Sequence, residues 1–213
     1  MPQPPDPMAL GDFDMVKIGD VPPQPWLAAL SKIDPETWDE MDYRQSRTRV
    51  GGGPGIHSAT QSLPVLWNMP PEFNRVRPQH QIKLHRGQLF HRPLHQLRHA
   101  CHHTYGRGWL LRCLVVRLPA GEEIPRHRDN GYSFEVSHRI HVPLISDPAV
   151  RFKVGETEVH MAEGEVWEIN NFRYHAVRND SLVNRLHVIA DWHTPSFASV
   201  DYNDPPVPLE VAQ

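Results

Sequence analysis

Residues 139–169, RIHVPLISDPAVRFKVGETEVHMAEGEVWEI, decide the fold class of this chain. Short runs rich in Val, Ile and aromatic residues alternate there with turn signals built from Asp, Pro and Gly. This pattern predicts β-strands joined by tight turns. Many short strands in succession are typical of an all-β sandwich or barrel. We expect strands at residues 139–145, 150–154, 158–161 and 165–169, with similar runs at 110–118 and 186–192 on either side.

The amino-terminal half mixes helix and strand signals. Proline at an early helical position and Gly-rich punctuation mark the boundaries of its segments. The expected elements are a strand at 15–18, a helix at 26–33, a second helix entry at 34–38, a loop at 51–55 and a half-buried strand at 63–67.

The length of 213 residues is enough for one domain with a buried core. We place this domain at residues 13–197, with its core at 109–193. Proline-rich stretches at 1–12 and 198–213 are expected to be loose tails. The formal net charge of −3 argues against nucleic acid or an anionic membrane as the main partner.

Two cysteines, Cys101 and Cys113, are too few for a disulfide framework, so we expect buried thiols in a reducing compartment. The chain does not open on a signal-peptide pattern, and it has no apolar run of membrane-spanning length. A cytoplasmic protein is therefore expected.

A candidate metal site follows a turn near Gly121. Residues 124–127 are expected to be extended, and residues two apart on an extended segment project to one face. His127 and Asp129 can therefore bind one ion together. A further histidine, His175, follows the expected strand at 165–169. Two histidines and one carboxylate suit Fe(II) and leave coordination positions open.

Each of these residues also has an ordinary structural explanation. The sequence Asp129-Asn130-Gly131 is a good turn, in which the Asp side chain would bond to its own backbone. His175 is also compatible with a core histidine.

Arg185 adds what a bare metal site lacks. If 2-oxoglutarate chelates iron through its 1-carboxylate and 2-keto oxygen, its far carboxylate needs a fixed cationic partner. A guanidinium group is always charged and binds carboxylates through two parallel hydrogen bonds. The alternation along 185–191 is compatible with Arg185 and His187 sharing one side of a strand.

These residues carry a resemblance to a known family. The stretch 115–193 resembles the aspartyl/asparaginyl β-hydroxylase family of Fe(II)/2-oxoglutarate oxygenases, particularly its small bacterial branch that includes proline cis-4-hydroxylases. The matching strings are 117–121 (RLPAG), 125–129 (PRHRD), 138–144 (HRIHVPL), 163–167 (EGEVW), 171–175 (NFRYH) and 184–191 (NRLHVIAD).

The resemblance implies a double-stranded β-helix of the jelly-roll, cupin-like type, with the amino-terminal helices packed outside. It also implies an Fe(II)/2-oxoglutarate-dependent dioxygenase that uses O2 to hydroxylate an unactivated C–H bond. The substrate would be a small molecule, an amino acid or an aminoacyl or peptidyl derivative, and succinate and CO2 would be released. Vertebrate members have glycine in place of the iron-binding carboxylate, so Asp129 places this chain nearer the bacterial branch.

The resemblance also assigns roles to residues. His127, Asp129 and His175 would bind iron, and Arg185 would pair with the distal carboxylate of 2-oxoglutarate. Arg139 and His141, two residues apart on one expected strand, would help to hold 2-oxoglutarate or substrate, and which does which stays open. For the carboxylate of an amino-acid substrate the candidates are Arg139, Arg117 and Arg128, and Trp167 is a candidate for the pocket wall, as are Tyr132 and Phe134.

Two alternatives from other classes remain at this point. One is a cupin-type metal enzyme, a dioxygenase or isomerase that does not use 2-oxoglutarate. The other is a non-catalytic metal-binding barrel. The cupin-type enzyme has no particular need of Arg185.

Seven histidines fall between His80 and His103. His95, His99 and His102 have helical spacing, with Leu94, Leu97 and Cys101 as expected core positions. A second metal site there is an alternative to the interpretation that we favour, an amphipathic helix whose polar face uses histidine.

Overall fold

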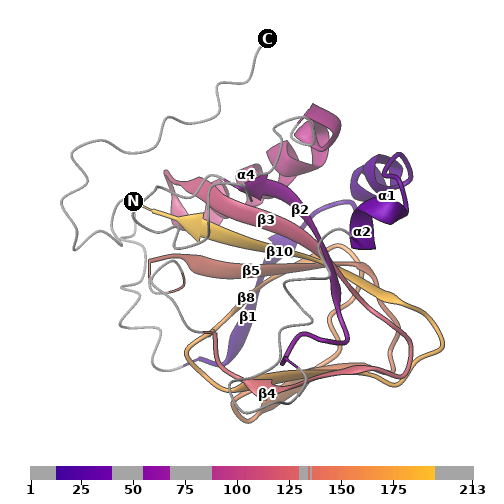
Figure 1. Ribbon diagram of the computed structural model, residues 1–213. Helices are drawn as coiled ribbons and strands as arrows, with labels where there is room; N and C mark the ends of the chain where they lie inside the picture. The colour runs from indigo at the N-terminus through magenta and orange to yellow at the C-terminus, as the bar shows by residue number, and fades with distance from the viewer. Residues whose placement is uncertain (1–12, 40–54, 68–87, 130–133, 135, 195–213) are drawn as a thin grey trace.

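The computed structural model describes residues 13–39, 55–67, 88–129, 134 and 136–194 (Figure 1). The two expected tails and most of the Gly-rich loop at 51–55 lie outside these residues. Two antiparallel β-sheets form the body of the described chain, and no cis peptide bond occurs in it.

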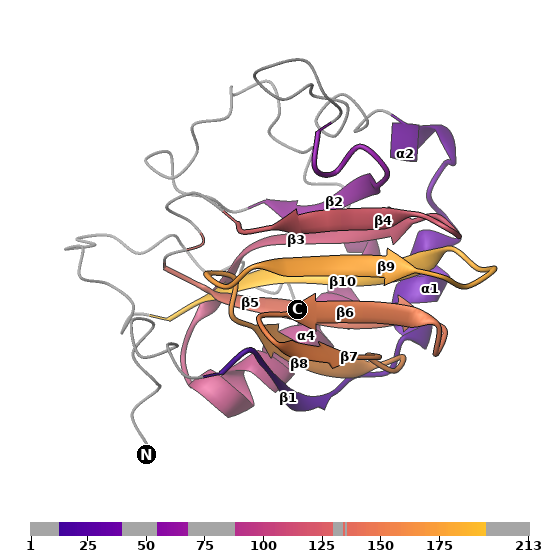
Figure 2. The same ribbon diagram turned by 90° about the horizontal axis from the view of Figure 1, so that it is seen from below.

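The larger sheet has six strands in the order β1-β8-β5-β10-β3-β2, and the smaller has four in the order β4-β9-β6-β7. Figure 2 shows the smaller sheet lying over the strands of the larger one. The strands of the larger sheet are β1 (Met15–Asp20), β2 (Gln61–Trp67), β3 (Trp109–Leu118), β5 (His138–Ile145), β8 (Glu165–Ile169) and β10 (Arg185–His193). Those of the smaller are β4 (Glu123–His127), β6 (Val150–Val154), β7 (Thr157–Val159) and β9 (His175–Asn179).

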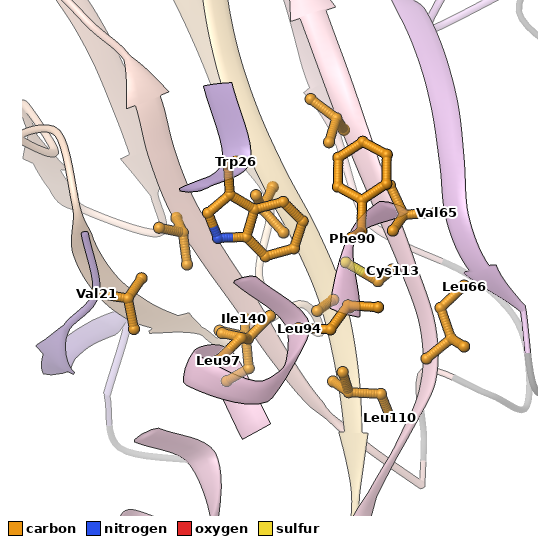
Figure 3. Packing of buried hydrophobic residues seen from close by; sticks show 14 of the residues in the cluster. Val21, Trp26, Val65, Leu66, Phe90, Leu94, Leu97, Leu110, Cys113 and Ile140 are labelled. Atoms are coloured by element: carbon orange, nitrogen blue, oxygen red, sulfur yellow. The ribbon is translucent and has the colours of Figure 1, made fainter. Parts of the chain in front are cut away.

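Helices α1 (Gln24–Leu30), α2 (Glu36–Asp39) and α4 (His91–Tyr105) pack outside the sheets. The buried face of α4 carries Leu94, Leu97 and Cys101, as the helical spacing predicts. These side chains pack with Trp26 of α1 and with outward-facing residues of the larger sheet such as Ile140 (Figure 3). This cluster is the main hydrophobic core.

A second, smaller cluster belongs to the strands and their connections. Phe152 and Val177 are buried in it with Leu118 of the larger sheet. Alternation along the strands therefore gives the larger sheet an apolar face under α4 and an inner face toward the smaller sheet.

The fold agrees with the mainly β expectation, with differences of detail. The helix expected at 26–33 is α1, which ends at Leu30. Strand β9 was not predicted, because HAVRN is short and three of its five residues are polar. The strand expected at 158–161 is β7, which ends at Val159. Both cysteines are buried and unpaired, as expected. Among the described residues, no helix is long and apolar enough to cross a membrane.

Candidate active site

The inner face of the larger sheet carries an unusual set of polar side chains. On β5, Arg139 and His141 alternate with His138, Ile140 and Val142, which face the other way into the core under α4. On β10, Arg185 and Asp191 lie on the inner face, while Val188, Ala190 and Trp192 belong to the core. The two-residue period of the strands thus places several charged groups in one cavity.

His127, Asp129 and His175 come together at one end of the smaller sheet. His127 is the last residue of β4 and pairs in register with His175, the first residue of β9. One ligand atom from each of the three residues lies within 4.8 Å of the others. The Nε2 atoms of both histidines lie 4.0 Å from Asp129 carboxylate oxygens. The carboxylate of Asp129 thus lies beside both histidines, as the metal-site interpretation predicts.

Backbone carbonyls fix the tautomer of both imidazoles. Nδ1 of His127 lies 2.7 Å from the carbonyl oxygen of Pro125, and Nδ1 of His175 lies 3.1 Å from that of Arg173. A carbonyl oxygen only accepts, so each Nδ1 carries a proton, and in the neutral imidazole Nε2 presents its lone pair toward Asp129. Metal-bound histidines are oriented by second hydrogen bonds of this kind.

The donor set fits Fe(II). Burial lowers the pKa of His175, which favours the neutral imidazole that a metal requires. Burial alone would raise the pKa of Asp129, but the positive charge of Arg139, with smaller effects of the two histidines, holds it below its ordinary value. Two imidazoles and one carboxylate form the set typical of non-heme iron oxygenases.

A chain of buried ion pairs leads from Asp129 into the larger sheet. Nε of Arg139 lies 3.4 Å from Oδ2 of Asp129, and its Nη1 donates to Oδ1 of Asp191 at 2.7 Å. The other oxygen of Asp191 accepts from Nε of Arg112. Both guanidinium groups also lie over the ring of Phe134, with centroid distances of 4.3 Å for Arg112 and 4.9 Å for Arg139.

Arg185 is buried, and no carboxylate of the described residues pairs with it. Only 1% of its surface is exposed, and its Nε and Nη1 have no hydrogen-bond partner among the described residues. Its Nη2 lies 2.6 Å from Nδ1 of His187. Burial lowers the pKa of Arg185 to about 9, so the group remains charged at neutral pH. An uncompensated buried cation is costly unless an anion binds beside it.

One cavity of about 240 Å³ joins the candidate metal centre to Arg185. Arg139 and His141 line it, as the resemblance implied, and both ring nitrogens of His141 lack partners in the described part of the chain. Pockets for drug-sized ligands begin at about 300 Å³, so this cavity suits a smaller ligand.

Three of the residues predicted to bind substrate lie away from this cavity. Arg117 is stacked on Trp38 at 4.3 Å and donates to Gln61. Arg128 lies over the ring of Tyr174, and Trp167 donates to Glu165. None of Arg117, Arg128 and Trp167 is among the cavity-lining residues. Tyr132 lies outside the described residues, whereas Phe134 lines the cavity.

Sequence reasoning missed two lining residues, Arg112 and His57. Arg112 pairs in register with Asp191. Because Arg112 and Leu114 alternate along β3 with Cys113, which lies in the core, the sequence did carry a signal that Arg112 faces the other side of the sheet. His57 comes from the turn before β2 and lies edge-on to His127, with ring centroids 5.0 Å apart. No sequence pattern marks it.

The histidines on α4 do not form a comparable site. His95, His99 and His102 are exposed. In the described part of the chain, the only group of three potential ligands close enough to share an ion is His127, Asp129 and His175. His80 and His85 lie outside that part.

Comparisons with known proteins bear on this arrangement. Residues 96–195 match the family model of aspartyl/asparaginyl beta-hydroxylase. An oxidoreductase of the 2OG-Fe(II) oxygenase family from Burkholderia pseudomallei is 14% identical over 88% of this chain and 87% of its own, with a TM-score of 0.52. The nickel complex of ThoJ, a non-heme monooxygenase, is 15% identical over 85% of this chain and 74% of its own, with a TM-score of 0.51. No curated protein sequence matches.

The two solved structures establish the fold, a jelly roll like that of the 2-oxoglutarate oxygenases. The expected fold class is thereby confirmed. At this level of identity they say nothing of the substrate.

Proposed function

We propose that this chain, whose residues 96–195 match the aspartyl/asparaginyl β-hydroxylase family, is an Fe(II)/2-oxoglutarate-dependent hydroxylase. Its proposed substrate is a small amino acid or an aminoacyl or peptidyl derivative. One oxygen atom of O2 enters a C–H bond of the substrate as hydroxyl. The other enters succinate as 2-oxoglutarate loses CO2. The observation that carries the proposal is that Arg185, buried in the same cavity as His127, Asp129 and His175, has no carboxylate partner among the described residues.

In this proposal His127 and His175 hold Fe(II) through Nε2, and Asp129 holds it through a carboxylate oxygen. Bound Fe(II) and 2-oxoglutarate supply the oxidising chemistry when O2 arrives. The protein contributes ligand geometry, charge and the placement of the substrate. The Nδ1 hydrogen bonds to backbone carbonyls hold both imidazoles in the tautomer that this requires.

Arg185 binds the distal carboxylate of 2-oxoglutarate. Its Nε and Nη1 are adjacent donors on one edge of the guanidinium group, and both lack partners in the described part of the chain. A carboxylate accepts two parallel hydrogen bonds from such an edge. This need for an anion favours a 2-oxoglutarate enzyme over a cupin that uses no such cosubstrate.

The charges of the cavity also favour a substrate with one carboxylate. Fe(II) is balanced by Asp129 and the 1-carboxylate of 2-oxoglutarate, and Arg185 by the distal carboxylate. Arg112 and Arg139, which share Asp191, are the other cationic side chains that line the cavity. We assign the substrate carboxylate to this group, at Arg139 and Arg112, in place of the predicted Arg117 and Arg128.

The test is titration of 2-oxoglutarate into the anaerobic Fe(II) protein, followed by the absorbance of the metal complex. Arg185→Ala should lose about 2 to 5 kcal/mol of binding free energy, which is roughly tenfold to several-thousandfold in Kd. Arg185→Lys should recover only part, because Lys lacks the planar pair of donors. Arg117→Ala, outside the cavity, is the matched control and should bind as wild type.

Equal 2-oxoglutarate affinity in wild type and Arg185→Ala would contradict the role of Arg185. Substrate class is tested separately, by incubating the iron protein with proteinogenic amino acids and measuring succinate and hydroxylated product. Succinate release that is stimulated by none of the amino acids nor by short peptides would contradict the substrate assignment.

A further inference from the structure

The guanidinium group of Arg185 is held by a neutral partner. Its Nη2 lies 2.6 Å from Nδ1 of His187, two residues along β10. A guanidinium group only donates hydrogen bonds, so Nδ1 of His187 must be the acceptor. The proton of the imidazole is then on Nε2, and His187 carries no charge.

The other two arginines of the cavity are held in a different way. Arg139 contacts the carboxylates of Asp191 and Asp129, and Arg112 contacts Asp191. Each of these two guanidinium groups therefore has a carboxylate partner within the protein. Arg185 is fixed in place with its charge left available to a ligand.

His187 is placed to act through Arg185 and not on a ligand directly. It is 1% exposed and is not among the residues that line the cavity. Arg185 and His187 project to the same face of β10, since their pairing with Leu118 and Val116 of β3 is continuous. The imidazole also lies near His141, with ring centroids 6.3 Å apart. No carboxylate of the described residues pairs with Arg185 or His187.

We propose that His187 is a positioning residue that orients Arg185 through an uncharged acceptor and so preserves the full attraction of Arg185 for the distal carboxylate of a 2-oxo diacid. This inference rests on the proposed function. It makes a claim that a packing role would not: the identity of residue 187 affects only ligands that carry a distal carboxylate.

The experiment compares two chelating ligands, 2-oxoglutarate and pyruvate, which lacks the distal carboxylate. Each is titrated into the anaerobic Fe(II) protein and followed by absorbance. His187→Leu removes the acceptor at similar volume. It should weaken 2-oxoglutarate binding by roughly tenfold to a hundredfold, the range expected for a hydrogen bond to a charged group, and leave pyruvate binding unchanged.

Two further variants separate orientation from charge. His187→Asn places an oxygen acceptor near the position of Nδ1 and should restore most of the affinity for 2-oxoglutarate. His187→Asp also offers an acceptor but neutralises Arg185, so it should bind 2-oxoglutarate no better than the Leu variant. In an Arg185→Gln background, His187→Leu should have no further effect, because the residue acts through the guanidinium group.

Three results would overturn the inference. These are wild-type affinity for 2-oxoglutarate in His187→Leu, an equal loss for pyruvate and 2-oxoglutarate, or wild-type affinity in His187→Asp. Failure of the proposed function has a different signature, since neither 2-oxo acid would then bind to the wild-type iron protein.

Discussion

The three residues proposed to hold iron are fixed by the fold in different ways. His127 and His175 face each other across paired strands, and each has its Nδ1 proton bound to a backbone carbonyl. Asp129 lies beyond the end of β4 and is oriented by Arg139. Loss of either histidine therefore removes a rigidly placed donor, whereas loss of the carboxylate leaves both rigidly placed donors in position.

We predict that His127→Ala and His175→Ala each abolish Fe(II) binding and turnover, and that Asp129→Ala weakens both severely. Anaerobic Fe(II) titration and succinate release measure the two effects. His99→Ala, an exposed position on α4, is the control and should keep both. A folded His175→Ala variant with normal turnover would contradict the assignment of His175 as an iron ligand.

The sequence predicted the residues whose spacing along the chain is itself a signal. His127 and Asp129 are two apart on an extended segment, and Arg185 alternates with apolar residues of one strand. Arg112 and His57 reach the same cavity from distant segments, through the register of β3 with β10 and through the turn before β2. Register and loop paths are tertiary features, so one-dimensional spacing does not reveal them.

At the scale of elements, α4 decides which face of the larger sheet becomes the cavity. Its apolar face covers Ile140, Val142 and Ala190, so the alternate residues of β5 and β10 must point toward the smaller sheet. The helical spacing of Leu94, Leu97 and Cys101 was readable in the sequence. Strand β9 was not, because a five-residue segment that begins and ends with polar residues gives no clear period.

Leu97→Ala should destabilise the protein by about 2 to 5 kcal/mol, since Leu97 is fully buried between α4 and the sheet and its loss leaves a cavity. Urea unfolding measures the change. Leu182→Ala is the control: this residue is 97% exposed in the β9–β10 turn, so the change should be within about 0.5 kcal/mol. Similar urea concentrations at the unfolding midpoint for the two variants would contradict the role given to α4.

At the scale of the whole molecule, the ion pairs of the cavity connect parts that are remote in sequence. Arg112 of β3, Asp191 of β10 and Arg139 of β5 link three strands of the larger sheet, and Asp129 extends the link to the end of β4 in the smaller sheet. The same groups set the charge of the proposed substrate site. Stability and substrate binding therefore depend on one set of side chains.

Asp191→Asn tests this dependence. The carboxylate of Asp191 is fully buried between two guanidinium groups, and its loss leaves both with too little negative charge. We expect a loss of about 3 to 5 kcal/mol in the free energy of unfolding, measured in urea. Asp180→Asn is the matched control, because its pair with Arg178 is exposed and surface pairs contribute about 0 to 1 kcal/mol.

Iron binding should also weaken in Asp191→Asn, since Arg139 would then be balanced by Asp129 alone and would compete with the metal for that carboxylate. Wild-type stability together with wild-type Fe(II) affinity would show that the buried ion pairs do not connect the sheets to the metal centre.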